Sequence, residues 1–284
     1  MLSDINRRHV KSRADLRQRR KRGHFCIVTP RWLVIRFVMV SEKPWTPVDV
    51  LRLLMAWLLL LCGAELIRAQ FAPAGAFQAN TNSVTTLVVQ MLGLHVAALV
   101  LVGVLLWRRG ISWADAFGLG APRWGLAVGV GALVGLLVLA PAWALGQLSA
   151  LVLEGIGFPV KPQQAVQMVQ SAASAGERVL TALMAVGLAP MVEEVLFRGV
   201  IYPTVKQVGY PRTAIWGTAF FFAAIHGTPA IFVPLFFLGA LLAHLYERTG
   251  TLLVPITAHA VFNLVNFLWL MNPELVRRWF GADA

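Results

Sequence analysis

Three short groups of polar residues interrupt the apolar second half of the chain, and their side chains could activate a water molecule and stabilise an oxyanion. The densest group runs from Glu193 and Glu194 to Arg198. Glu194 and Arg198 are four residues apart, a spacing at which a glutamate and a basic residue pair on one helix face. Glu193 is rotated by about 100° from Glu194, so it is left to face a polar cavity and take a proton from water. The alternative is that both glutamates cap the end of a membrane span beside Arg198.

The other two groups supply His226, four residues after Phe222, and His259, four residues before Asn263. The latter spacing puts His259 and Asn263 on one helix face, where an imidazole and an amide can stabilise an oxyanion, or the imidazole can bind metal. Each group also has a plainer interpretation. His226 would be a packed or solvated residue at a helix end, and His259 with Asn263 an interhelical hydrogen bond.

The remaining polar residues exclude several hydrolase classes. The five aspartates fall in tails, in loops and at the margin of the first apolar stretch, so no intramembrane aspartate pair is available. The sequence contains neither Gly-x-Ser-x-Gly nor His-Glu-x-x-His. Cys26 and Cys62 support neither a metal site nor a disulfide framework. Glu65, His95 and His244 belong to none of the three groups, and we interpret them as structural or interfacial.

The elements that position these groups are expected to be membrane helices. Of 284 residues, 58% are hydrophobic and 13% charged, whereas soluble proteins carry about 25% charged residues, and the mean hydropathy is +0.69. Apolar stretches of about 18 to 24 residues are long enough to cross a hydrocarbon core of roughly 30 Å. We therefore predict an all-α, polytopic transmembrane bundle, which excludes a secreted disulfide scaffold, a nucleic-acid-binding domain and a disordered chain.

Seven spans are expected, at about 48–67, 84–107, 125–148, 178–197, 212–226, 229–246 and 252–271. The fifth is short, and its aromatic run at 220–222 indicates a helix buried among others. The linker at about 149–177 is expected to be an extramembrane loop. The third span carries glycines at a spacing that permits close helix approach, namely Gly125, Gly129, Gly131 and Gly135.

Charge divides the chain into a basic tail, 1–43, and a transmembrane domain, 44–284. The tail has twelve basic and three acidic residues, about +9 of the net +12. By the positive-inside rule this tail and the exits of even-numbered spans face the cytoplasm; in a prokaryote the membrane would be the plasma membrane. With seven spans, Arg277 and Arg278 would lie on the outer side of the membrane, which conflicts with this rule; an eighth span would remove the conflict.

The three polar groups, in this order on successive apolar helices, resemble the CPBP family of intramembrane proteases, the CAAX prenyl endopeptidase and bacteriocin-processing group. The resemblance is strongest over about 180–265, extends more weakly from about 84, and does not cover the tail. It implies a helical bundle whose polar cavity opens near the cytoplasmic face. There Glu193 would activate water beside His226, with His259 and Asn263 around the scissile carbonyl. Glu194, Arg198 and Phe222 also match motif positions, and we assign them a supporting role.

The resemblance leaves metal and substrate open. Glu193, His226 and His259 could bind zinc with water in a fourth position, but Glu193 is also wanted as the base, so we favour a metal-independent mechanism. The expected partners are a peptide or protein substrate, lipidated or not, and the bilayer, with no nucleic acid. A non-enzymatic scaffold or bacteriocin-immunity protein and a proton-coupled transporter remain the alternatives.

Overall fold

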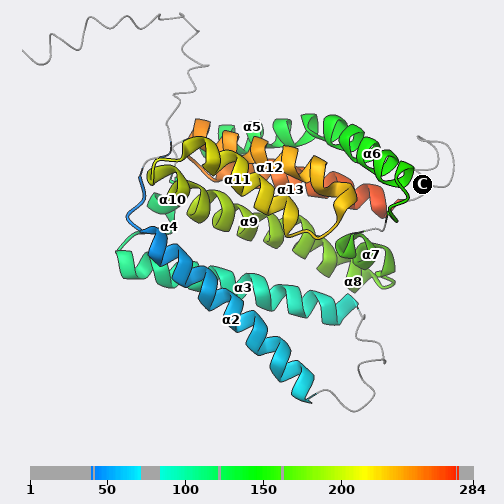
Figure 1. Ribbon diagram of the computed structural model, residues 1–284, viewed down its shortest axis with the longest axis horizontal. Coiled ribbons are helices and arrows are strands. Elements are labelled where there is room, and N and C mark those ends of the chain that lie inside the picture. Colours follow the sequence, from blue (N-terminus) through cyan, green and yellow to red (C-terminus); the bar gives the residue numbers. More distant parts are fainter. Residues whose placement is uncertain are drawn as a thin grey trace, which may run out of the picture. The chain divides into compact units, whose positions relative to one another are not determined.

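The computed structural model describes residues 40, 42–71, 84–120, 123–160, 163–272 and 274. Every regular element in this part of the chain is a helix (Figure 1), which confirms the all-α prediction. The predicted basic tail lies outside the described residues except for Val40 and positions 42–43, and so do Cys26, Arg277 and Arg278.

Six helical segments in the described residues are long and apolar enough to cross a membrane, as expected for a polytopic protein. They lie in α2 (Pro47–Phe71), α3 (Val84–Arg109), α5 with α6 (Trp124–Leu137 and Leu139–Gly155), the long helix Ala175–Gln207, α12 (Pro229–Thr249) and α13 (Leu253–Leu270).

The fifth expected span, at about 212–226, is too short to qualify. Helix α11 (Pro211–Ala224) has 14 residues, about 21 Å at 1.5 Å per residue. Its burial was also wrongly predicted, because Phe220 and Phe221 are more than half exposed and only Phe222 is buried. The expected loop at 149–177 is partly helical as well, since it contains the end of α6, the short helix α7 (Gln164–Ser171) and the start of the next helix.

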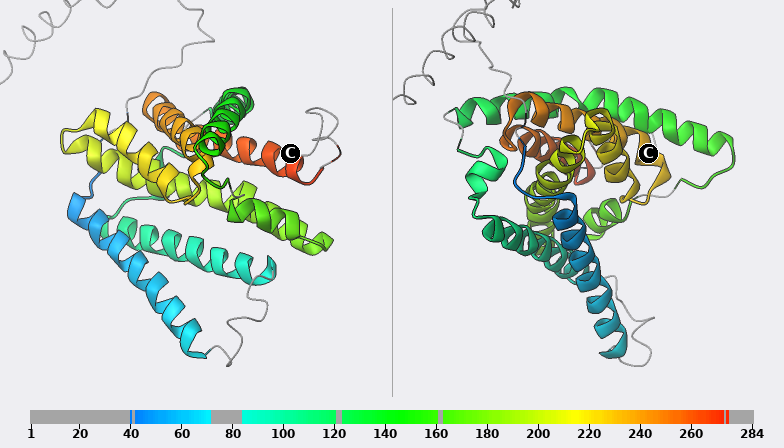
Figure 2. Two further views of the ribbon diagram at one scale, coloured as in Figure 1. Left: turned by 45° about the vertical axis from the view of Figure 1, so that its right-hand side comes forward. Right: turned by 60° about the vertical axis from the view of Figure 1, so that its left-hand side comes forward.

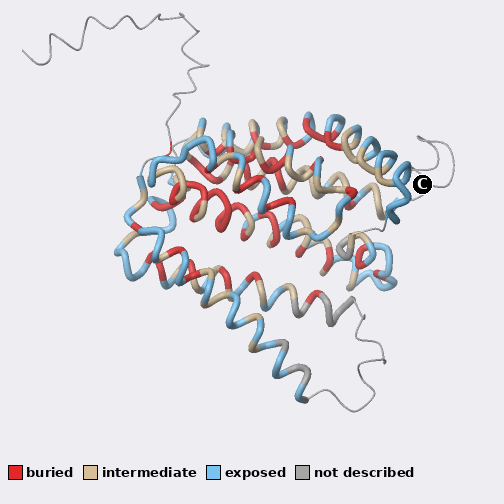
Figure 3. Tube along the Cα trace, in the orientation of Figure 1, coloured by how far each residue is buried: buried red, intermediate tan, exposed pale blue. Residues whose placement is uncertain are grey.

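The long helix Ala175–Gln207 carries the Glu-Glu-x-x-x-Arg group and lies between α2 and α3 on one side and α5 and α6 on the other (Figures 1 and 2). It starts at a capping box, in which Ser174 and Glu177 exchange side-chain to backbone hydrogen bonds of 3.1 and 3.2 Å. Buried residues are concentrated along its second half, whereas α2 is mostly exposed (Figure 3).

Two π-helical segments divide this helix into α8 (Ala175–Ala182), η2 (Leu183–Leu188), α9 (Ala189–Glu194), η3 (Val195–Ile201) and α10 (Tyr202–Gln207). A proline follows shortly after each segment, Pro190 after η2 and Pro203 after η3. Proline has no N–H for the carbonyl four residues earlier, and that carbonyl lies inside the preceding π segment. The prolines thus account for where the helix widens, on either side of the two glutamates.

Helix α13 is held close to α5 by two of the four glycines noted in the sequence. A Cβ added at Gly131 would lie 2.6 Å from the Val254 oxygen, and one at Gly135 would lie 2.5 Å from the Ala258 oxygen. Gly129, by contrast, has nothing within 4 Å of its Cβ position. The close approach sets the position of His259, the residue after Ala258, against α9.

The chain segment before α2 is tied to the end of α10. The Lys43 backbone N–H donates to Gln207 (3.0 Å), and the Trp45 indole donates to Thr204 (3.1 Å). The Lys43 ammonium donates to the Ala116 carbonyl (2.6 Å), and burial lowers the pKa of this lysine. The bonds to Gln207 and Thr204 join the segment before α2 to the helix that carries the candidate site.

Candidate active site

Glu194 and Arg198 form a fully buried ion pair, as their spacing predicted. The Arg198 Nη1 to Glu194 Oε1 distance is 2.8 Å, and neither side chain is exposed. Arg198 also donates to the Gly239 carbonyl of α12 (2.8 Å), and its guanidinium lies 4.7 Å from the centre of the Phe222 ring. The pair joins three helices, so Glu194 is neutralised and fixed in place.

The two glutamates lie in the middle of their helix, not at its end. The helix was expected to stop near 197, but it continues to Gln207 because η3 accommodates Pro203. Glu193 and Glu194 therefore do not cap a helix terminus. Which end of the helix faces the cytoplasm stays a prediction.

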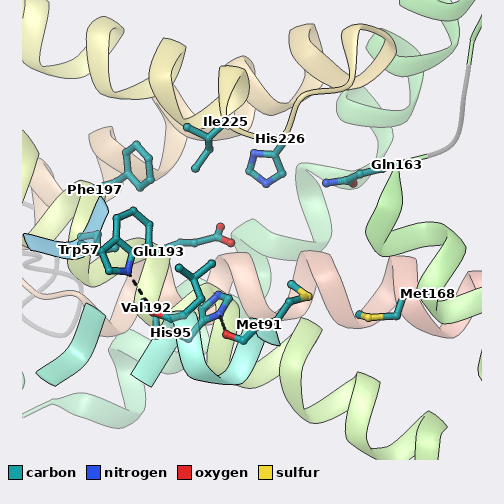
Figure 4. Close-up of a pocket in the computed structure, with 12 residues that line it drawn as sticks. Trp57, Met91, His95, Gln163, Met168, Val192, Glu193, Phe197, Ile225 and His226 are labelled. Carbon is teal, nitrogen blue, oxygen red and sulfur yellow. Dashed lines mark hydrogen bonds between the residues drawn. The ribbon is translucent and has the colours of Figure 1, made fainter. Parts of the chain in front are cut away.

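Glu193 faces a cavity of about 340 Å³, with its side chain 22% exposed. The cavity wall is contributed by α2, α3, α7, the long helix and the end of α11 (Figure 4). Most of its lining is apolar, including Leu94, Met168 and Leu196, and the other polar side chains on it are His95, Gln163 and His226. A carboxylate in this setting meets few other polar groups, so it is available to a bound water or peptide.

His226 lies on the same wall, just after α11 ends, and its tautomer is fixed. Its Nδ1 lies 2.6 Å from the Phe222 carbonyl oxygen. Because a carbonyl only accepts, Nδ1 carries the hydrogen and the Nε2 of the neutral ring is an acceptor. The chain then turns at Gly227, whose φ of +64° suits glycine. His226 thus offers a lone pair beside Glu193.

His259, on α13, is buried and contacts both carboxylates. Its Nδ1 lies 3.0 Å from Glu194 Oε1, and its Nε2 lies 3.8 Å from Glu193 Oε2. The first distance is that of a hydrogen bond, whereas the second is too long for one. The Phe222 ring packs edge-on against both His226 and His259, with centroids 4.9 and 5.6 Å away. Phe222 therefore orients the two imidazoles.

Asn263 makes the interhelical hydrogen bond that the sequence left open as its plainer interpretation. Its Nδ2 donates to the Ala185 carbonyl (2.8 Å), which lies in η2. A π segment disturbs the usual helix hydrogen bonds, and a neighbouring helix can satisfy such a carbonyl. This bond uses one of the two N–H groups of the amide, so the oxyanion role stays a prediction.

The three possible zinc ligands predicted from the sequence, Glu193, His226 and His259, do not form a metal-binding group in the structure. Among the described residues, no three His, Cys, Asp or Glu side chains lie together as ligands would. Glu193 and His226 share the cavity wall, while His259 is directed at Glu194 through its Nδ1. Since the residues do not fit the ion in this arrangement, no catalytic step is assigned to a metal.

The sequence analysis missed His95, which the structure places on the cavity wall. It is 7% exposed and lies in α3, outside all three motif groups. The signal that could have identified it is an ionisable residue in the interior of an apolar span, which is rare without a function. His244 is exposed, as an interfacial residue would be, and the side chain of Glu65 lies outside the described set.

Fold and site together define a membrane-embedded helical protein with a carboxylate and a histidine on one internal cavity. Residues 175–265 match the family model of Rce1-like type II CAAX prenyl endopeptidases. Over these residues the match confirms the resemblance to the CPBP family of intramembrane proteases. Searches of curated proteins and of solved structures give no significant match.

Proposed function

We propose that this protein is an intramembrane endopeptidase in which Glu193 is the general base. The main support for this proposal is that Glu193 lines the cavity together with His226, whereas its neighbour Glu194 is held in a buried ion pair with Arg198. Two adjacent carboxylates in such different environments have different roles, one reactive and one structural.

In the proposed reaction, a water bound between Glu193 and His226 Nε2 gives a proton to Glu193 and adds through its oxygen to the scissile carbonyl carbon. The oxyanion accepts a hydrogen bond from the second N–H of Asn263, and the His259 imidazole packs beside the same carbonyl. When the tetrahedral intermediate collapses, the C–N bond breaks and Glu193 passes its proton to the leaving nitrogen. Glu194, Arg198 and Phe222 keep the two imidazoles in place.

The proposed substrate is a peptide that reaches the site at the cytoplasmic face, with the N terminus of the protease on that side. The largely apolar cavity wall suits aliphatic side chains or a lipid chain. A farnesylated peptide ending in Cys-a-a-X and its unprenylated counterpart are the two probes that separate these options.

The test is cleavage by purified protein in detergent, against both probes and a pooled peptide library, with products identified by mass spectrometry. Wild type should release defined fragments and Glu193→Ala should not. Glu154→Gln, at an exposed position on α6, is the matched control and should cleave normally. Peptide binding without cleavage by wild type would instead indicate the scaffold or immunity protein, and proton-driven uptake into proteoliposomes the transporter.

A further inference from the structure

His95 brings a second imidazole to the cavity from a helix that the motif groups do not include. Helix α3 contacts α9, and through this contact His95 lines the same cavity as Glu193 and His226. In the view of Figure 4 the Glu193 carboxylate is seen between the two imidazoles. The site therefore has a histidine on each of two walls.

The orientation of His95 repeats that of His226. Its Nδ1 lies 2.5 Å from the carbonyl oxygen of Met91, four residues earlier on the same helix, as His226 Nδ1 lies 2.6 Å from Phe222. In both cases the carbonyl can only accept, so Nδ1 is the donor and Nε2 of the neutral ring is the acceptor. No hydrogen bond to His95 Nε2 is found among the described residues.

The side chains around His95 are mostly apolar, and a hydrogen bond between α2 and α3 lies next to it. Met91, Leu94 and Val192 lie on the same part of the lining, and the Trp57 indole of α2 donates to the Leu94 carbonyl next to His95 (3.2 Å). A peptide backbone N–H that enters such a wall loses its water partners, which is unfavourable if it finds no acceptor there. An acceptor at this position would remove that cost.

We propose that His95 Nε2 accepts a hydrogen bond from a backbone N–H of the bound peptide and so positions its scissile bond against Glu193. The proposal rests on the proposed peptidase function for the identity of the ligand. His95 is thereby a substrate-binding residue and takes no part in the proton transfers.

Two substitutions separate this role from a structural one. Asparagine can replace Nδ1, and so keep the hydrogen bond to Met91, but it does not reach the Nε2 position. Glutamine reaches that position and offers an acceptor oxygen there, but loses the Nδ1 bond. Substrate binding through Nε2 therefore predicts that His95→Gln retains function and His95→Asn loses it, whereas a purely structural role predicts the reverse.

The experiment measures binding of a fluorescent farnesylated Cys-a-a-X peptide and its unprenylated form to Glu193→Gln protein, alone and combined with each His95 substitution. Adding His95→Asn should weaken binding about tenfold, with unchanged thermal stability, while His95→Gln should stay within about threefold. In otherwise wild-type protein, the loss in His95→Asn should appear in KM more than in kcat.

Retained binding in His95→Asn, or equal losses in both variants, would overturn the proposal. Binding by Glu193→Gln protein without cleavage by wild type would refute the peptidase function alone and leave the His95 comparison valid. No binding of either peptide by Glu193→Gln protein would overturn the binding role of His95 as well.

Discussion

The buried Glu194–Arg198 pair is the feature whose removal should destabilise the protein most. The two perturbations are Glu194→Gln, which removes the negative charge but keeps an acceptor, and Arg198→Met, which keeps much of the volume but removes the cation. Neither group reaches solvent, so each substitution leaves its partner in a low-dielectric interior. Breaking a buried pair in this way costs about 3–5 kcal/mol.

The contacts of the pair also determine what the double variant should do. Arg198 would keep only the Gly239 carbonyl and the Phe222 ring as strong partners, and a guanidinium cannot lose its proton. Glu194 would keep the His259 donor. Among the described residues, Glu194 Oε2 and Arg198 Nε have no hydrogen-bond partner, so pairing does little more than offset the cost of burying two charges. Removing both charges should therefore cost no more than removing one.

The assay is equilibrium unfolding in mixed detergent micelles, with the four proteins of a double-mutant cycle compared at one pH. We expect each single variant to lose about 3–5 kcal/mol of unfolding free energy. The double variant should lose no more than one single variant, which is a coupling of about 3–5 kcal/mol. Arg109→Gln is the control, since its ion pair with Asp49 is partly exposed and should contribute at most about 1 kcal/mol. Single variants as mild as this control, or an additive double variant, would refute the reasoning.

Three further predictions concern α13 and metal. Gly135→Ala should lower the unfolding free energy by about 1–3 kcal/mol and reduce activity, because the new methyl group would meet the Ala258 carbonyl of α13. Gly129→Ala, on the same helix α5, should be neutral or stabilising. Equal effects of the two substitutions would argue against the close packing of α5 and α13. Asn263→Ala should reduce kcat by about 10²–10³-fold, because it removes an oxyanion donor. The control Asn266→Ala loses hydrogen bonds to Trp143 and Phe262 and should affect stability alone. Equal losses of kcat in the two variants would contradict the oxyanion role of Asn263. Activity should survive chelation, and stoichiometric zinc that is lost and restored together with activity would overturn the metal-independent mechanism.

The sequence predicted the helical fold and the separation of the two glutamates for reasons that need no tertiary information. Apolar length identifies membrane helices, and the four-residue spacing of Glu194 and Arg198 identifies a pair on one face. The same spacing directed Glu193 elsewhere, and the structure places it on the cavity. These inferences depend only on local helix geometry.

The sequence-based predictions were wrong where contacts between helices determine the length of a helix or the direction of a side chain. The fourth span was expected to end near 197, but the widened η3 segment lets the helix continue past Pro203 to Gln207, so the two glutamates lie in its middle. Helices that are apolar all round carry no clear polar face, and the sequence therefore could not show which side of the second span faces the site. For this reason His95 was assigned to structure, although it lines the cavity.

The most direct test of the account is the activity of Glu193→Gln, because the amide is nearly isosteric with the carboxylate but cannot take a proton from water. With Glu154→Gln as the matched control, turnover of the best wild-type substrate should fall by at least about 10²-fold, as for loss of a general base, with unfolding free energy unchanged. Residual turnover above about a tenth of wild type, in protein that is as stable as the control, would contradict the role of Glu193.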